Sequence, residues 1–413
     1  MNLKTENKLE ERISTNSEKQ IGIVIVLGFL SALAPFSMDM YLPALPTLTT
    51  DLHTSTSLAQ LSLMFCLLGL AFGQLIAGPI SDARGRRIPL IIGMVIFIVS
   101  SLLCAFTSSI EVLIILRLIQ GLAGSVGLVI SRAVVRDYYT GNKMTQFFAL
   151  LMLVNGIAPI VAPIIGGQLL RLTSWQGIFL ILATLGIGLL VGVIYKLPES
   201  LPLEKRQTGG IKQTLSSMQT LIRDRVFMGY VLSQGFIMAA MFAYISGSPF
   251  VLQKFYGISP QAYSAIFATN SIGIIFASQL SSKLCQRYGE KKVLVSGLIL
   301  AGLGSLLLLI MIQVEAGLIG LLPPLFIVVS CVGLIGPAST SLAMERQGKH
   351  AGSASALTGL AQMGLGAIAT PIVGLGGSNT ATPMGLVIII CTVCALLCYL
   401  LLVRSYKRSY EKA

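Results

Sequence analysis

One acidic residue of this chain lies where ionisation is most costly. Asp39 sits in LSALAPFSMDMYLPALPTL, residues 30–48, a run that carries no other charge and has prolines on both sides of the acid. A carboxyl group is retained in apolar surroundings when it exchanges protons or binds a cation or a hydrogen-bond donor. The alternative is a fixed ion pair that only holds two helices together.

Arg117 is the expected partner of Asp39. It lies in a second apolar run, VLIILRLIQGLAGSVGLVI, residues 112–130, which has no other charged residue. If both runs are helices, each charge lies about six residues from the same end, so the two occupy the same depth. Burial favours a neutral carboxyl group and a nearby arginine favours a charged one. We therefore predict that Asp39 and Arg117 form a site that takes up and releases a proton.

The composition identifies the surroundings of this pair as a lipid bilayer. Hydrophobic residues make up 54% of the 413 residues, charged residues only 11%, and the mean hydropathy is +0.83. Soluble domains carry about 25% charged residues. Apolar runs long enough to span a bilayer as helix recur along the chain, and they are continuous rather than alternating, which excludes a membrane β-barrel. The fold class is an all-α membrane protein.

We predict twelve transmembrane helices in two bundles of six. The predicted spans are residues 21–45, 57–80, 88–106, 111–135, 144–169, 175–196, 226–251, 260–282, 292–312, 317–344, 351–375 and 383–403. The domains that follow are an N-terminal tail (1–20), a first bundle (21–196), a linker (197–225), a second bundle (226–403) and a C-terminal tail (404–413). Of the sixteen acidic residues, Asp39 alone lies well inside a predicted span.

The distribution of basic residues favours a cytoplasmic location for both termini. With the N-terminus inside, nearly all of the 29 lysines and arginines fall on the cytoplasmic side, and only Arg171 and Lys254 fall outside. This asymmetry follows the positive-inside rule. It also explains the net charge of +13 without nucleic acid, for which a basic stripe with stacking aromatic residues would be expected.

Metal and cofactor sites are not expected. The seven cysteines lie within or at the edges of the predicted spans, and the only histidines, His53 and His350, lie in predicted loops. A zinc site needs converging cysteine or histidine ligands. The cysteines are expected to pack as small apolar residues.

Weak internal repetition favours a transporter. APIVAPIIGGQ in the fifth predicted span recurs in altered form as IATPIVGLGGS in the eleventh, and SDARGRR after the second span resembles CQRYGEKK after the eighth. Two related halves of six spans are typical of transporters that bind substrate between the halves and open to alternate sides. The two bundles are therefore expected to be related by a pseudo-two-fold axis.

Several motifs resemble those of the major facilitator superfamily. GPISDARGRR (Gly78 to Arg87) is similar to its loop signature, RLIQGLAGS (Arg117 to Ser125) to its fourth-span motif, and NGIAPIVAPIIGG (Asn155 to Gly167) to the fifth-span motif of its antiporters. SMDMYLPALP and AGSASAL resemble the Bcr/CflA group of drug:proton antiporters. The resemblance covers essentially the whole chain after residue 20.

The resemblance implies roles for two groups of residues. A gate on the cytoplasmic side would use Gly78, Asp82, Gly85, Arg86 and Asp137, with Arg86 bridging to Asp137 and Asp82 placed to cap a neighbouring helix. The antiporter motif would use Gly156, Pro159, Pro163, Gly166 and Gly167. Prolines kink a helix and glycines permit close approach of its neighbour.

A drug pocket is expected to combine apolar and aromatic walls with a few polar groups. The candidates around the proton site are Phe36, Asp39, Arg117, Gln120, Asn155, Phe236, Met238, Met241, Phe242, Tyr244 and Asn270.

The sequence thus predicts a protein that is not an enzyme. We expect a monomeric multi-pass antiporter of the bacterial inner membrane, which exports small amphiphilic antibiotics such as bicyclomycin or phenicols in exchange for protons. The remaining alternative is a proton symporter or facilitator of the same superfamily for a small metabolite. The expected partners are drug, protons and lipid.

Overall fold

The described part of the chain is helical throughout. The computed structural model describes residues 22–23, 25–139, 141–206, 219–345, 347, 351–377 and 380–404. The predicted N-terminal tail, nearly all of the C-terminal tail and the middle of the linker, residues 207–218, lie outside the described residues. Within the described ranges every regular element is an α-helix, a 3-10 helix or a π-helical turn.

Eleven helices of the described chain are long and apolar enough to cross a membrane. The first, Ile25–Asp51, includes the 3-10 turn η1 (Leu42–Ala44) and α2 (Leu45–Asp51). The other ten are built on α3 (Thr56–Arg84), α4 (Arg87–Phe106), α5 (Ile110–Tyr138), α6 (Gly141–Leu169), α7 (Trp175–Lys196), α9 (Arg225–Pro249) with η3 (Phe250–Phe255), α11 (Glu290–Gln313), α12 (Gly317–Met344), α13 (Ala351–Gly374) and α14 (Thr382–Cys398) with η5 (Tyr399–Arg404).

The predicted span 260–282 forms a helix that is more polar than the others. It corresponds to α10 (Pro260–Tyr288), whose 29 residues are enough to span a bilayer core of about 30 Å. Its polar side chains Ser264, Asn270 and Ser271 are buried within the protein, whereas Phe276 is 71% exposed. The polar face therefore explains why α10 falls short of the hydropathy of a lipid-surrounded span. Its role as a twelfth span stays a prediction.

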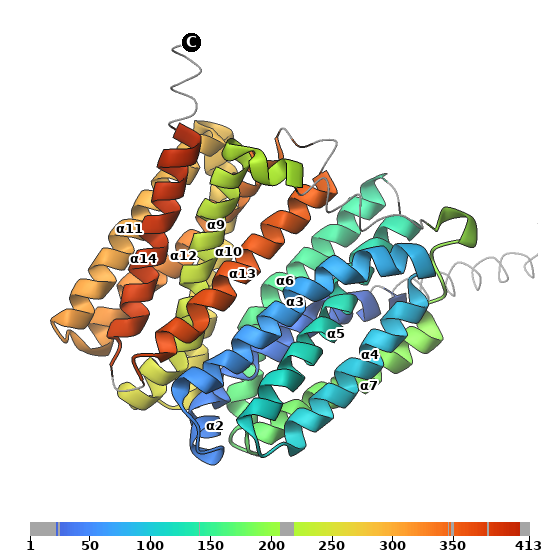
Figure 1. The fold of residues 1–413 in the computed structure, drawn as a ribbon, viewed down its shortest axis with the longest axis horizontal. Coiled ribbons are helices and arrows are strands. Elements are labelled where there is room, and N and C mark those ends of the chain that lie inside the picture. The colour runs from blue at the N-terminus through green and yellow to red at the C-terminus, as the bar shows by residue number, and fades with distance from the viewer. Residues whose placement is uncertain are drawn as a thin grey trace, which may run out of the picture.

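The helices form two groups that lie side by side (Figure 1). The first half, Ile25 to Lys196, packs α3 against α5 and α4 against α7, and the second half, Arg225 to Arg404, packs α9 against α13 and α14. The halves meet where α3 contacts α13 and where α6 contacts α10. We call the end that carries Arg84, Lys196 and Arg225 the basic end, and the other the opposite end.

The two halves are joined at the opposite end. Gln60 of α3 donates to the Ser246 carbonyl of α9 at 2.9 Å, and Gln261 of α10 donates to the Gly167 carbonyl of α6 at 2.7 Å. Closer to the basic end, a cavity of about 190 Å³ lies between α3, α5 and α13, and Gln74 and Ser355 line it. The described halves are therefore in contact at one end and leave space nearer the other.

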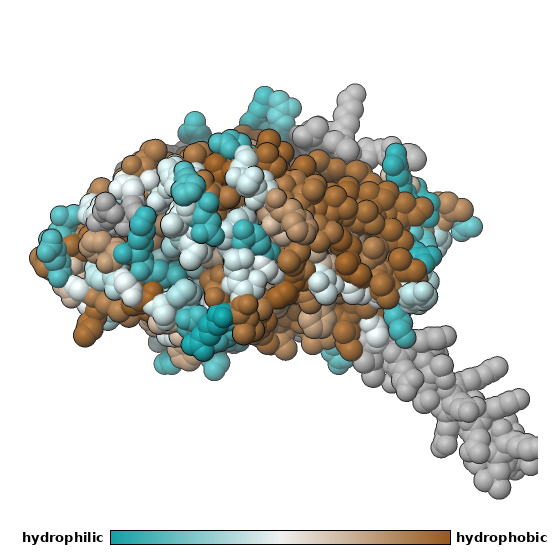
Figure 2. Space-filling model, turned by 90° about the horizontal axis from the view of Figure 1, so that it is seen from below, coloured by the Kyte–Doolittle hydropathy of each residue, from teal (hydrophilic) through white to brown (hydrophobic). Residues whose placement is uncertain are grey.

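The outer surface is suited to lipid rather than water. Large apolar side chains point outward from mid-helix positions, including Phe276 at 71% and Ile390 at 58% exposure. Figure 2 shows a broad hydrophobic area over one part of the molecule, with hydrophilic residues gathered elsewhere. A soluble protein rarely exposes such an area, whereas a multi-pass membrane protein requires it.

Candidate functional site

The helix that carries Asp39 ends at this residue. Residues 25–39 are helical, residues 40 and 41 form a turn, and η1 follows. Pro43 and Pro46 have no N–H group, so the carbonyls of Asp39 and Leu42 lose their usual donors and the helix cannot continue regularly. The prolines that flank the acid therefore place Asp39 at a helix end inside the protein.

The carboxylate of Asp39 is buried and has no recorded partner. The residue is only 6% exposed, and no hydrogen bond or ion pair reaches its side chain from the residues that the structure describes. A charged carboxylate is stable in such a place only with a donor or water. The site is thus suited to a neutral carboxyl group, or to a carboxylate that binds a cationic or donor group.

Arg117 does not form the expected ion pair with Asp39. The guanidinium donates to the Ser37 carbonyl at 2.9 Å and to the Gln120 side chain, which in turn donates to Ser101. Its charge lies over the ring of Tyr41, 4.9 Å from the centroid. The reason is the helix end at Asp39, because the last carbonyls of a helix lack donors and carry partial negative charge.

Two nitrogens of this buried arginine remain unused. Arg117 is 0% exposed, and its Nε and Nη2 atoms have no hydrogen-bond partner among the described residues. A second ring, that of Phe179, lies 5.7 Å from the guanidinium carbon. Arg117 is therefore stabilised by one helix end, one amide and two aromatic rings rather than by a countercharge.

The second half places polar groups opposite Asp39. Tyr244 of α9 and Tyr263 of α10 both lie within electrostatic reach of its carboxylate. Asn270 donates to the Tyr244 hydroxyl at 2.8 Å, and Tyr263 contacts Ser248 at 3.4 Å. The sequence interpretation included Tyr244 and Asn270 but missed Tyr263. This tyrosine follows SPQA at the start of a predicted span, and nothing in the local sequence distinguishes it from other residues that begin a span.

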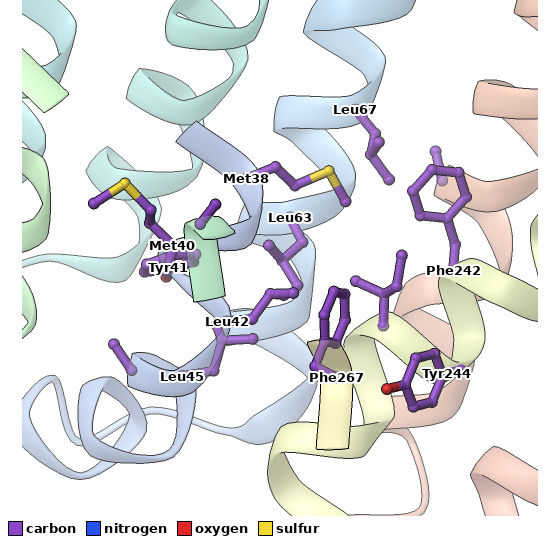
Figure 3. Close-up of a cluster of buried hydrophobic side chains, with 14 of the residues drawn as sticks. Met38, Met40, Tyr41, Leu42, Leu45, Leu63, Leu67, Phe242, Tyr244 and Phe267 are labelled. Atoms are coloured by element: carbon purple, nitrogen blue, oxygen red, sulfur yellow. The ribbon is translucent and has the colours of Figure 1, made fainter. Parts of the chain in front are cut away.

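An apolar cluster bridges the halves beside these polar groups. Figure 3 shows Met38, Leu63 and Leu67 of the first half across from Phe242, Tyr244 and Phe267 of the second. The Tyr244 and Phe267 rings are stacked with centroids 5.7 Å apart. This cluster packs the two halves together next to Met38 and Met40, the neighbours of Asp39 in the chain.

The other predicted pocket residues divide into two groups. Phe36, Met238 and Met241 pack against the same cluster that contains Phe242 and Tyr244. Phe236 instead packs against a separate cluster inside the second half, and Asn155 donates to Ser31 and to its own helix. The structure therefore does not bring Phe236 to the apolar group around Asp39.

The antiporter motif holds the helix end at Asp39 against the second half. A Cβ atom at Gly166 would collide with the Met40 carbonyl, and one at Gly167 would collide with Ser264 of α10. Ser264 also donates to the Pro163 carbonyl at 2.7 Å. Pro159 and Pro163 lie inside α6 as predicted, whereas a Cβ at Gly156 would meet only Ile275, at 3.9 Å.

The predicted gate forms a charged network at the basic end. Arg86 is 3% exposed and donates to Asp137 at 3.0 Å, to Ser81 at 2.8 Å and to Asp82. The predicted bridge from Arg86 to Asp137 is confirmed. Burial alone would lower the pKa of Arg86, but the hydrogen bonds and charges of Asp137 and Asp82 raise it above its ordinary value.

Glu199, which the sequence interpretation missed, completes this network. It accepts from the backbone N–H groups of Arg86 and Arg87, at 2.8 and 3.1 Å, and so caps the start of α4. Asp82 was expected to cap a helix but pairs with Arg86 instead. Gly85 has a φ of 91°, and a Cβ there would meet Glu199, so this position requires glycine. A Cβ at Gly78 would meet nothing within 4 Å.

We expect Arg86→Met to destabilise the protein by about 2 kcal/mol, because it leaves two acids with fewer partners in a partly buried site. Asp82→Asn should cost less, since Asp82 is 43% exposed. The thermal unfolding midpoint of the purified protein in detergent measures both. Equal midpoints for the two variants would contradict the view that Arg86 contributes more to the stability of this network than Asp82 does.

The contribution of Glu199 should depend on pH. Burial raises the pKa of Glu199, but backbone hydrogen bonds from Arg86, Leu201 and Arg87 and the charge of Arg206 lower it below its usual value. The stabilisation is therefore complete above the pKa of the unfolded chain, about 4.3, and is lost as the pH falls through the folded value. We expect Glu199→Gln to cost about 1 kcal/mol at pH 7, and the difference from wild type to vanish in acid. A gap in unfolding midpoint that is as large in acid, well below the folded pKa, as it is at pH 7 would contradict this.

Comparison with known proteins identifies the family of this arrangement. Residues 27–371 match the model described as Major Facilitator Superfamily. An uncharacterized MFS-type transporter, YdgK, of Bacillus subtilis (strain 168) is 43% identical, with 91% of this chain and 94% of that protein covered.

Two further relatives carry resistance names. The bicyclomycin resistance protein homolog of Haemophilus influenzae (strain ATCC 51907 / DSM 11121 / KW20 / Rd) is 28% identical over 93% of this chain and 97% of its own length. The chloramphenicol resistance protein of Pseudomonas aeruginosa is 30% identical over 87% of this chain and 86% of its own. The crystal structure of a D-xylose-proton symporter has the same fold, with a TM-score of 0.72 at 16% identity, covering 91% of this chain and 97% of that one.

Proposed function

Because this chain belongs to the Major Facilitator Superfamily, and within it to the Bcr/CflA group, we propose that it exports small amphiphilic antibiotics in exchange for protons. The proposed substrates are of the kind of bicyclomycin or the phenicols, which the names of its relatives support. One observation carries the proton exchange: Asp39 is a buried carboxyl group of the first half that has no recorded partner among the described residues and lies within electrostatic reach of Tyr244 in the second half.

We place the basic end in the cytoplasm of a bacterial cell, at the inner membrane. The positive-inside rule supports this orientation, and it puts both termini on the cytoplasmic side of twelve spans. In this orientation the joined ends of the halves face outward. The cavity between α3, α5 and α13 then lies toward the cytoplasm, where drug would enter a monomeric carrier.

The protonation state of Asp39 would decide which side can open. Neutral Asp39 tolerates apolar surroundings such as the cluster of Figure 3, which includes its neighbours Met38 and Met40, whereas an ionised carboxylate needs water or a donor and so favours separation of the halves. Outward opening would break the hydrogen bonds of Gln60 and Gln261 and admit protons from outside. Proton release and drug binding would then follow in the cytoplasm-open state.

The drug would contact both halves near Asp39. Phe36 and Met241 supply apolar surface, and Tyr244 with Asn270 supplies polar groups. These side chains come from the first helix, α9 and α10. The affinity for a ligand held between these side chains would therefore depend on the relative position of the two halves.

A metabolite symporter is the alternative, since the D-xylose-proton symporter shares the fold. Everted membrane vesicles distinguish the two, because an exporter takes drug into them when their interior is acidified. We expect gradient-dependent uptake of radiolabelled chloramphenicol, absent from vesicles without the protein and abolished by a protonophore. No uptake of chloramphenicol or bicyclomycin under an imposed gradient would contradict drug export.

A further inference from the structure

An apolar groove runs along the outer face of the first half. It has a volume of about 360 Å³ and lies between α3, α4 and α5. Its lining is aliphatic, with Ile80, Ile92, Ile96 and Val126 among the side chains, and it contains one charged residue, Arg84. Because Arg84 ends α3, the only charge among the described lining residues lies at the basic end.

Arg84 is the arginine of its loop for which the described part of the chain shows no partner. Arg86 is engaged by Asp82 and Asp137, and Arg87 donates to the Ile194 carbonyl at 2.8 Å. The side chain of Arg84 is exposed and makes no recorded hydrogen bond or ion pair with the residues that the structure describes. Its guanidinium is therefore available to an external anion.

The second half provides an internal comparison. Its equivalent helices α10, α11 and α12 enclose a groove of the same volume, about 360 Å³, and none of its described lining residues is charged. When the loop glycines Gly85 and Gly289 are aligned, Tyr288 occupies the position of Arg84. The two grooves thus have similar size and apolar character, and they differ in the cation at the mouth.

We propose that the first groove binds an anionic phospholipid, with one acyl chain along the aliphatic lining and the headgroup phosphate on Arg84. The polarity of the groove matches this ligand, because it is apolar along its length and cationic at the end that reaches the membrane surface. Its described lining residues include no acid that would attract the ammonium group of a zwitterionic headgroup. A basic residue near the surface favours an anionic lipid by about fivefold in binding.

Native mass spectrometry of the purified full chain tests the headgroup. The probes are phosphatidylglycerol, phosphatidylethanolamine and diacylglycerol of the same chain length, added in equal amounts. We expect wild type to retain phosphatidylglycerol best, and Arg84→Gln to lower that retention about fivefold without changing diacylglycerol. Arg287→Gln is the matched control, since Arg287 is exposed in the last turn of α10 and stacks over Tyr288.

A second pair of variants tests the acyl-chain part. Ala77 lines the first groove and Ala277 the second, so leucine at each position narrows one groove only. We expect Ala77→Leu, but not Ala277→Leu, to lower phosphatidylglycerol retention. The proposal is overturned if wild type retains phosphatidylethanolamine equally well, if Arg84→Gln and Arg287→Gln have equal effects, or if Ala77→Leu leaves retention unchanged.

Discussion

Asp39→Asn is expected to abolish proton-driven drug uptake in everted vesicles while leaving the protein folded. Asparagine has nearly the shape of the protonated carboxyl group and the same tolerance of an apolar site, so packing at this 6% exposed position should survive. The variant cannot ionise, so it loses the change that would favour separation of the halves. Uptake should fall about tenfold or more, toward that of vesicles without the protein.

The control for this variant is Glu111→Gln. Glu111 lies at the start of α5 and accepts a hydrogen bond from the Ser109 hydroxyl. Its carboxylate is exposed, so it does not share the buried position that we propose for proton exchange. We expect it to transport normally. Drug exchange without a gradient should persist in Asp39→Asn, because the contacts of Tyr244 and Asn270 remain. Full gradient-driven uptake by Asp39→Asn would refute the assignment of this residue to proton coupling.

Hydropathy and charge were sufficient to predict a multi-pass helical protein. Eleven of the predicted spans appear as long apolar helices of the described chain, because each must satisfy its backbone groups internally in lipid. The span 260–282 has a different balance. Its polar residues Ser264 and Asn270 are buried within the protein, so its mean hydropathy is low although the helix has 29 residues.

The surroundings of Asp39 could be predicted in type but not in geometry. Counting residues along two helices gives the depth of Asp39 and Arg117, but it gives neither their direction around the helix axis nor the helix end at Asp39. The structure turns the arginine toward the Ser37 carbonyl and brings Tyr244 and Tyr263 within electrostatic reach of the acid. These partners are set by packing between helices distant in sequence.

Glu199 illustrates a signal that was present in the sequence. An acid directly after a proline, just beyond α7, is a usable cap for a neighbouring helix at the same end. Which helix it caps depends on how α4 and α7 pack, and this was not fixed by local pattern. Gly85, whose φ is 91°, is explained once that contact is known.

Arg117→Met is expected to abolish transport without destabilising the protein. The guanidinium is fully buried, and among the residues that the structure describes it has two unused nitrogens and no countercharge, which is a costly arrangement. An apolar side chain of similar volume removes the desolvation cost of the buried charge, and for whole buried ion pairs such a replacement is commonly neutral or stabilising by about 1–4 kcal/mol. That gain offsets the lost contacts to Ser37 and Gln120. Transport should still fail, because the helix end beside Asp39 loses its cation.

Arg86→Met provides the matched comparison, since Arg86 is equally buried but its donors are engaged by acids. We expect a lower unfolding midpoint for Arg86→Met and an unchanged or higher one for Arg117→Met. A double-mutant cycle adds a direct test of the pair: with no ion pair in this conformation, Asp39→Asn and Arg117→Met should show a coupling below about 0.5 kcal/mol. A coupling of several kcal/mol, together with strong destabilisation by Arg117→Met, would show that the two charges pair in the state that dominates in detergent.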